Sequence, residues 1–274
     1  MIRMADGPQS IMFNGVRRMK SLLRRVAPRR RPKGAHVYED LYEKHGRELP
    51  PTVSVGDGDF DLIGAIELGI LTMEGLRPEQ TIVDFGCGTG RLAVHLIPFL
   101  DGGAYVGIDI AQSMLQKAQA LVSGRIPKPR CRVTWQKQTD HRFQIEEASV
   151  DTVCAFSVFT HMEHEDAYRY LKAAQAIVRP GGRFIFSCLP MDLAAARDVF
   201  VASAGGPLEE RWAQIRNVTT SVDLMNAVAR LAGWEPVRWY RGDEQNVRVP
   251  GRTEMWGLGQ STCVLEKAAP PRHP

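Results

Sequence analysis

The chain has 274 residues, of which 44% are hydrophobic and 24% charged, a composition that excludes a fibrous or largely disordered protein. No run of about 18 or more apolar residues occurs, so no membrane-spanning helix is expected, and the N-terminus does not resemble a secretory signal. The formal net charge is +4, but residues 1–50 carry twelve basic and five acidic side chains and the remainder carries 23 and 26. The basic character therefore belongs to the N-terminal extension.

Five cysteines, none of them in a CxxC pair, indicate a reducing setting. They are Cys87, Cys131, Cys154, Cys188 and Cys263. Cys154 and Cys188 fall inside apolar runs, where a free cysteine behaves as a small hydrophobic residue. The pattern favours a cytoplasmic protein without a disulfide framework or a zinc site.

The extension formed by residues 1–50 contains the densest run of charge. Residues 17–33 hold nine basic residues and no acidic one. Apolar residues among them recur at helical spacing, so a short basic amphipathic helix ending before Pro28 is one prediction, and a partly disordered, solvated tail is the other. The helix would favour peripheral association with an anionic membrane surface, or with another acidic partner.

Helices and strands alternate from residue 57 onward. Helices are predicted at 57–76, 91–100, 111–124, 164–178 and 224–234. Strands are predicted at 81–85, 104–110, 131–138, 150–159, 183–189, 235–242 and 259–267. The alternation indicates an α/β fold with a doubly wound, mostly parallel sheet covered on both faces. The last two strands are expected to be antiparallel, because the connection between them has no helical pattern.

Residues 190–222 interrupt this alternation after the fifth strand. We expect an insertion with at least one helix, lying over the strand ends as a lid. The main domain is accordingly predicted at 51–267, and a disordered tail at 268–274.

A glycine loop follows the first strand. Residues 86–90, Gly-Cys-Gly-Thr-Gly, connect that strand to the start of a helix. Glycines let a ligand lie close to the backbone, and a helix start presents unpaired N–H groups to an anion. Asp109 ends the second strand, nineteen residues after Gly90, where an acid reaches the two hydroxyls of a bound ribose. The two features together predict a nucleoside site.

Two details argue against a dinucleotide as the ligand. The spacing is G-x-G-x-G, whereas dinucleotide sites use G-x-G-x-x-G. Asp84 precedes Gly86 by two residues, and a carboxylate there would repel a pyrophosphate but attract a cationic group such as an α-ammonium. A nucleotide-dependent oxidoreductase and a non-catalytic cofactor-binding module are the alternatives to an enzyme that uses such a ligand.

The segment "VDFGCGTG", with Asp109 in "GIDI", resembles the cofactor site of class I S-adenosylmethionine-dependent methyltransferases. The likeness extends over about residues 57–267 and includes "RPGGRFIFS" and "GQSTCVLEK". It implies a Rossmann-like methyltransferase fold, whose seven strands have the order 3-2-1-4-5-7-6 with the last strand antiparallel. It also implies S-adenosyl-L-methionine as the cofactor.

The resemblance assigns roles to individual residues. Gly86, Cys87 and Gly88 would lie against the methionine part, Asp84 would hold the ammonium, and Asp109 would bind the ribose hydroxyls. The adenine side is implied to consist of Ile110, Met114, Asp140 and His141. Phe156 and Ser157, near the end of the fourth strand, would flank the cofactor.

The fourth strand leads into "FSVFTHMEHED", which places His161 best for a general base. The alternative is that His161 packs against or caps the next helix. The acids beside it suit a helix start, and no distant third ligand accompanies them, so no metal is expected.

Three segments are expected to bind the methyl acceptor: residues 190–222, the surroundings of Tyr38 and Tyr42, and the loop 242–256. Their polar and aromatic candidates are Arg211, Trp212, Arg216, Arg248, Arg252 and Trp256. The body lacks a stripe of basic and aromatic residues, and no N/D-P-P-Y/F motif follows the fourth strand. We therefore expect methyl transfer to a small-molecule, glycan or lipid-linked acceptor, at oxygen rather than nitrogen, and no nucleic-acid partner.

Overall fold

The computed structural model describes residues 38–52, 58–207 and 214–267. The basic segment 17–33, the tail 268–274, and the acceptor candidates Arg211 and Trp212 lie outside the described residues. The domain boundaries and the membrane association predicted from them stay predictions. Among the described residues, no helix has both the length and the apolar character needed to cross a membrane.

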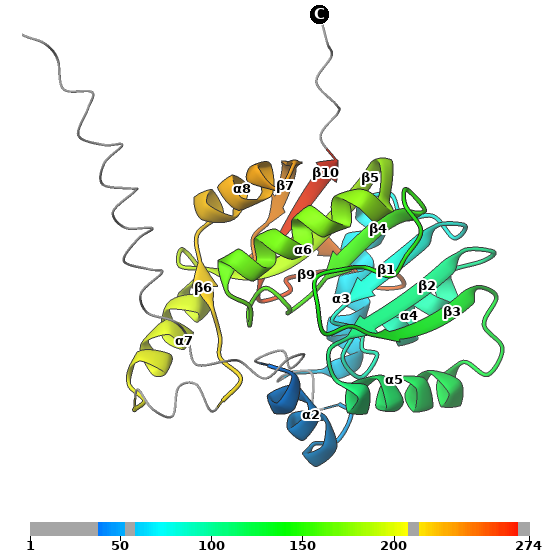
Figure 1. Cartoon of the computed structure of the whole chain (residues 1–274), viewed down its shortest axis with the longest axis horizontal. Coiled ribbons are helices and arrows are strands. Elements are labelled where there is room, and N and C mark those ends of the chain that lie inside the picture. Colours follow the sequence, from blue (N-terminus) through cyan, green and yellow to red (C-terminus); the bar gives the residue numbers. More distant parts are fainter. Residues whose placement is uncertain (1–37, 53–57, 208–213, 268–274) are drawn as a thin grey trace, which may run out of the picture. The chain divides into compact units, whose positions relative to one another are not determined.

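The central sheet has the strand order β3-β2-β1-β4-β5-β10-β7 (Figure 1). Its strands are β1 Thr81–Phe85, β2 Ala104–Asp109, β3 Arg132–Lys137, β4 Val150–Ala155, β5 Val178–Pro190, β7 Trp234–Tyr240 and β10 Ser261–Lys267. Strands β1 to β5 are parallel, and β10 is antiparallel to both β5 and β7. The predicted fold and its strand order 3-2-1-4-5-7-6 are confirmed.

Helices cover both faces of this sheet. The helices α3 Phe60–Met73, α4 Ala93–Phe99 and α5 Gln112–Arg125 cover one face, and α6 His164–Ile177 and α8 Val222–Leu231 cover the other (Figure 1). Successive side chains of a strand point to opposite faces of the sheet. Ile82 accordingly packs in the hydrophobic core beneath α3 and α4, and Val83 packs in the core beneath α6 and α8. The indole of Trp234 is fully buried in the core beneath α6 and α8, and its N–H donates to the carbonyl oxygen of Leu171 at 2.8 Å.

A helix that the sequence pattern did not predict, α2 Glu39–Glu48, packs against α5. The carboxylate of Glu43 accepts from the backbone N–H groups of Gln112 and Ser113, at 2.6 and 3.2 Å, and so caps the start of α5. Burial raises the pKa of the Glu43 carboxyl, but the hydrogen bonds from Ser113 and Gln112 outweigh it and hold the pKa below its ordinary value. Helix α2 has few apolar residues, so long-range polar contacts such as these contribute to its placement.

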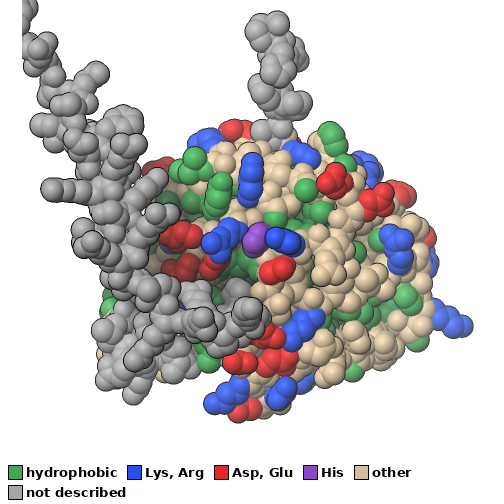
Figure 2. Space-filling view, in the orientation of Figure 1, with side chains coloured by type: hydrophobic (Ala, Val, Ile, Leu, Met, Phe, Trp, Pro, Cys, Tyr) green, Lys and Arg blue, Asp and Glu red, His purple; other side chains and the backbone are tan. Residues whose placement is uncertain are grey.

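The insertion and the last loop contain short elements. The predicted helix of the insertion is α7 Ala194–Ala204, and the strand β6 Thr219–Thr220 pairs with β5. The loop before β10 contains a small hairpin, β8 Val247–Arg248 with β9 Met255–Trp256, which the sequence did not predict. On the face shown in Figure 2, acidic and basic side chains are interspersed over the described part of the chain.

A buried carboxylate ties the end of α3 to the antiparallel side of the sheet. The side chain of Glu74 is 5% exposed, pairs with Arg183 at 2.8 Å and with Arg238 at 3.1 Å, and accepts from the Tyr240 hydroxyl at 2.5 Å. Glu74→Ala leaves these donors without their shared acceptor, so we expect it to lower the free energy of unfolding by about 2–4 kcal/mol. Urea unfolding followed by circular dichroism measures this loss.

The matched control is Glu266→Ala. Glu266 also pairs with Arg183, at 3.1 Å, but its side chain is 45% exposed. Its removal should cost less than about 1 kcal/mol. Equal losses in the two variants would contradict the role given to Glu74.

Candidate functional site

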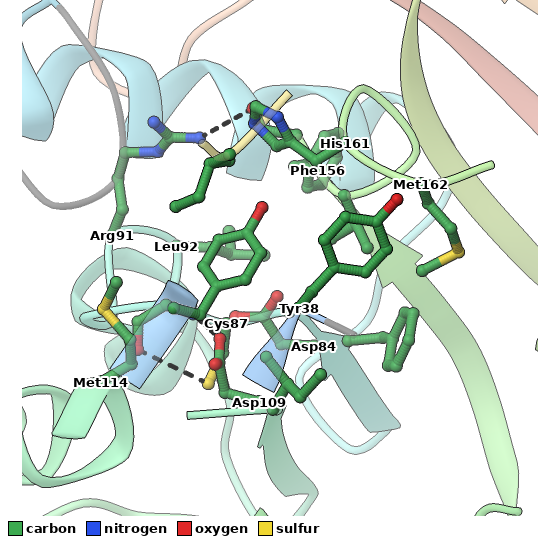
Figure 3. Close-up of a pocket in the computed structure, with 18 of the residues that line it drawn as sticks. Tyr38, Asp84, Cys87, Arg91, Leu92, Asp109, Met114, Phe156, His161 and Met162 are labelled. Atoms are coloured by element: carbon green, nitrogen blue, oxygen red, sulfur yellow. Dashed lines mark hydrogen bonds between the residues drawn. The ribbon is translucent and has the colours of Figure 1, made fainter. Parts of the chain in front are cut away.

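A cavity of about 540 Å³ opens at the carboxyl ends of β1, β2 and β4, where ligands of doubly wound sheets bind. Ten of the twelve residues predicted for the site line it. They are Asp84, Gly86, Cys87, Gly88, Asp109, Ile110, Met114, Phe156, Ser157 and His161. Figure 3 shows Asp84 and Asp109 at one end of the cavity and Arg91 and His161 at the other.

The glycine loop turns in a conformation that other residues adopt with strain. Gly86, Gly88 and Gly90 have φ values of 75°, 54° and 92°. A Cβ on Gly86 would lie 2.3 Å from Cγ2 of Val158, which leaves no room for a side chain. The backbone N–H groups of Gly86 and Cys87 both donate to the carbonyl oxygen of Ile108, at 2.7 and 2.9 Å, so the loop is anchored on β2.

Asp109 joins the glycine loop to the start of α5. Its Oδ2 accepts from the N–H of Gly88 and its Oδ1 from the N–H of Ala111, both at 2.9 Å. Burial raises the pKa of the Asp109 carboxyl to about 6. The carboxylate keeps acceptor capacity beyond these contacts, so it could accept from a ligand hydroxyl such as that of a ribose.

Asp84 is on β1, between β2 and β4, and its side chain is on the face of the sheet that α3 and α4 cover. It is 3% exposed, and its Oδ2 accepts from the Tyr105 hydroxyl at 2.8 Å. Burial raises the pKa of the Asp84 carboxyl to about 7, so part of the population is protonated near neutral pH. A cationic ligand group beside it would favour the charged form and draw that pKa down.

A buried ion pair at the opposite end of the cavity was not predicted from the sequence. Nη2 of Arg91, just after the glycine loop, lies 2.5 Å from Oε1 of Glu67 on α3, and both side chains are nearly inaccessible. Burial raises the pKa of the Glu67 carboxyl, and the Arg91 guanidinium opposes that rise. The available signal was a single acid in the apolar run "LIGAIELGIL", because such an acid needs a buried partner.

Helix α2 supplies an aromatic side of the cavity. Tyr38, Tyr42 and His45 line it, as expected for the two tyrosines. The helix is fixed by Glu43 at the start of α5 and by Glu39, whose carboxylate lies 2.7 Å from Nζ of Lys137. Burial raises the pKa of the Tyr42 hydroxyl, so this group stays protonated and can donate a hydrogen bond.

His161 faces the cavity with its tautomer fixed. Its Nδ1 lies 2.8 Å from the carbonyl oxygen of Arg216, and a carbonyl oxygen only accepts, so Nδ1 carries the proton. Nε2 of the neutral ring is therefore the basic nitrogen. Burial lowers the pKa of His161, which keeps the ring neutral near pH 7. Arg216 also pairs with Glu163 at 2.9 Å, so the insertion is attached to the loop that carries His161.

Two predicted residues lie elsewhere. Asp140 and His141 are exposed and do not line the cavity, whereas Gln138 is buried and does. The backbone N–H of Gln138 donates to the carbonyl oxygen of Asp109 at 3.0 Å, and its side-chain amide donates to that of Asp140 at 2.9 Å. The chain turns outward after Gln138, a shift of two residues that the pattern "KQTDHRFQ" did not reveal.

The last loop contacts the cavity through residues other than those expected. Arg248, Arg252 and Trp256 are absent from the lining, and the guanidinium of Arg252 lies 5.6 Å from the Trp256 ring centre. Leu258 and Gln260 line the cavity instead. Ile215 and Asn217 line the cavity from the insertion, the segment 190–222 that was expected there. Other lining residues that the sequence did not indicate are Ile63, Phe85, Leu92, Val158, Met162 and Tyr170.

Comparisons with known proteins agree with this geometry. Residues 82–182 match a family model described as a methyltransferase domain. A segment of 113 residues is 31% identical to the O-methyltransferase resE of Aspergillus sclerotiorum and covers 41% of each chain, so the match spans well under half of that relative's length.

Solved structures share the fold. Magnesium protoporphyrin IX methyltransferase of Synechocystis PCC 6803, with bound SAH, superposes with a TM-score of 0.60 at 17% identity, over 84% of this chain and 96% of that one. The PH0226 protein of Pyrococcus horikoshii gives a TM-score of 0.58 at 16% identity, over 82% and 98% of the two chains. At these identities the likeness concerns the fold.

The raised pKa of Asp84 predicts that binding of an ammonium-bearing nucleoside depends on pH. The bound ammonium lowers a pKa that is about 7 in the free protein, so affinity is present above pH 7 and lost as the pH falls through it. With S-adenosylhomocysteine as the titrant, we expect the Kd to rise about tenfold from pH 8 to pH 6. Calorimetry at the two pH values measures it.

The control for this pH dependence is Asp84→Asn. The amide cannot ionise, so the variant should bind more weakly at pH 8 and respond much less to pH. A wild-type Kd that is the same at pH 6 and pH 8 would show that Asp84 does not contact the ammonium.

Proposed function

We propose that this chain, whose residues 82–182 match a methyltransferase domain, is a class I S-adenosylmethionine-dependent methyltransferase that transfers a methyl group to an oxygen of a small-molecule, glycan or lipid-linked acceptor. The observation that carries the proposal is that Asp84, Asp109 and His161 line one cavity around the glycine loop. S-adenosylmethionine, when bound, supplies a methyl group activated by the sulfonium sulfur. The residues of the chain then have to bind, align and exclude water, and to accept a proton from the acceptor.

The described residues fit this cofactor. Asp84 is a buried carboxylate suited to the ammonium of the methionine part, and Asp109 has lone pairs for the ribose hydroxyls. The backbone at Gly86 and Gly88 allows close approach. The buried Gln138 lies where we expect the adenine end, in place of Asp140.

Oxygen as the accepting atom is supported by the state of His161. A hydroxyl has to lose its proton during methyl transfer, whereas a neutral amine attacks through its own lone pair and loses a proton afterwards. His161 is neutral near pH 7 and holds Nδ1–H on the Arg216 carbonyl, so Nε2 is the atom that would take the hydroxyl proton. The name of the Aspergillus relative, an O-methyltransferase, agrees with this choice.

Binding of S-adenosylhomocysteine by the wild type and by Asp109→Ala is the first test. Loss of the carboxylate removes charge-assisted hydrogen bonds to the ribose and frees the N–H groups of Gly88 and Ala111, so we expect affinity to fall about 100-fold or more. Isothermal calorimetry at pH 8 measures it. Asp140→Ala, an exposed aspartate outside the cavity, should keep the wild-type affinity, and no binding by the folded wild type would refute the proposed function.

His161→Gln tests the general base. The rate of methyl transfer should fall by about 10²- to 10⁴-fold while affinity for S-adenosylhomocysteine stays within about twofold. The measurement is transfer of a labelled methyl group to hydroxylated acceptors, with turnover followed against pH. His164→Gln, at the start of α6 and outside the cavity lining, is the matched control, and an equal loss there would argue that the histidines act only through the local fold.

A further inference from the structure

The end of β4 is held in an unusual backbone conformation beside the acceptor end of the cavity. Ser157 has a φ of 57°, which non-glycine residues rarely adopt. Its backbone N–H donates to Oγ of Ser187 on β5 at 2.7 Å, a contact that fixes this turn. Residues in such conformations are frequent at functional sites when neighbouring groups hold them in place.

Ser187 in turn fixes the side chain of Gln260. Ser187 is fully buried, and its oxygen already accepts from Ser157, so its own O–H has to donate to an acceptor. The acceptor is Oε1 of Gln260, at 2.6 Å. The hydroxyl of Ser157 lies 3.2 Å from the same oxygen. The amide oxygen of Gln260 therefore faces both serine hydroxyls, and its nitrogen points away from them.

The amide nitrogen of Gln260 is left for a ligand. Among the described residues, none is found hydrogen-bonded to this Nε2, and Gln260 lines the cavity as a half-buried residue. An amide nitrogen carries two N–H donors, and a donor facing a partly closed cavity favours a ligand oxygen that accepts from it.

The surroundings of Gln260 indicate a neutral oxygen. Nη2 of Arg91 lies 3.4 Å from the Ser157 hydroxyl, on the same hydrogen-bond network, but Glu67 balances its charge at 2.5 Å. The network therefore offers donors without a net positive charge, which suits a carbonyl or hydroxyl oxygen better than a carboxylate. Figure 3 shows Arg91 and His161 at this end of the cavity.

We infer that Gln260 is a specificity-determining residue that donates an N–H hydrogen bond to a neutral oxygen of the methyl acceptor. This inference rests on the proposed function and names the acceptor class: a hydroxylated molecule with an apolar body and a second, uncharged oxygen. The apolar body would lie against Ile215 and Leu258, which line the same cavity. The hydroxyl to be methylated would face His161.

A matched pair of phenols tests the inference. 4-Hydroxyacetophenone and 4-ethylphenol have similar size and each carries one phenolic hydroxyl, but only the first carries a carbonyl oxygen. Calorimetric titration of the wild-type complex with S-adenosylhomocysteine should show about tenfold tighter binding of 4-hydroxyacetophenone. In Gln260→Glu the carboxylate still accepts from both serines but has no N–H, so the preference should fall to within about twofold.

Controls distinguish a failure of the Gln260 role from a failure of the proposed function. Affinity for S-adenosylhomocysteine should be unchanged in Gln260→Glu, and Gln260→Met, which adds no charge, should lose the same preference. If the wild type binds S-adenosylhomocysteine, three outcomes would overturn the role of Gln260 alone. They are equal affinity of the wild type for the two phenols, binding of neither phenol, and a preference for 4-hydroxyacetophenone that both variants retain. Absence of S-adenosylhomocysteine binding by the folded wild type would overturn the proposed function as well.

Discussion

The carboxylate of Asp109 is the contact on which the arrangement of the site depends. Its two oxygens accept from Gly88 in the glycine loop and from Ala111 at the start of α5. One side chain thus fixes the loop after β1, the end of β2 and the start of the next helix relative to one another. The same helix start is capped by Glu43, which brings α2 and its tyrosines over the cavity. The glycine loop and helix α2 are therefore both attached to the start of α5.

Burial gives the cavity an electrostatic character that a ligand would complete. Asp84, Asp109 and Glu67 are all nearly inaccessible, and burial raises the pKa of each carboxyl. Glu67 has Arg91 beside it, whereas Asp84 has only neutral hydrogen-bonding neighbours within the described residues. A positively charged ligand group would supply the missing partner at Asp84 and favour its ionised form. This difference between the two acids supports the proposal that the ammonium of the cofactor binds beside Asp84 and an uncharged acceptor beside Arg91.

The sequence predicted the parts of the fold that local pattern determines. Strands such as 81–85 and the glycine loop combine apolar runs with residues that have strong backbone preferences, so they were identified close to their observed bounds. Helix α2 was missed because its position depends on Glu43 and Glu39 contacting residues about 70 and 98 positions away. Asp140 was predicted and Gln138 was not, because a turn outward after β3 leaves no mark in hydrophobic periodicity. Gln260 was not predicted for a similar reason, since its partners are distant in sequence: Ser157 follows β4 and Ser187 is on β5.

The acceptor end differs from the cofactor end in how it is built. The cofactor end consists of backbone turns and two carboxylates on adjacent parallel strands, which the strand order alone brings together. The acceptor end combines side chains from α2, α3, the segment after β4, the insertion and the loop before β10. The Ser157–Ser187–Gln260 contacts and the contacts of His161 and Glu163 with Arg216 help to hold these segments in register. Because loops vary more readily than strands, substitutions at this end would change the acceptor without disturbing cofactor binding. Gln260 lines the cavity one residue before β10, so the inferred hydrogen bond to the acceptor would be positioned by the rigid sheet.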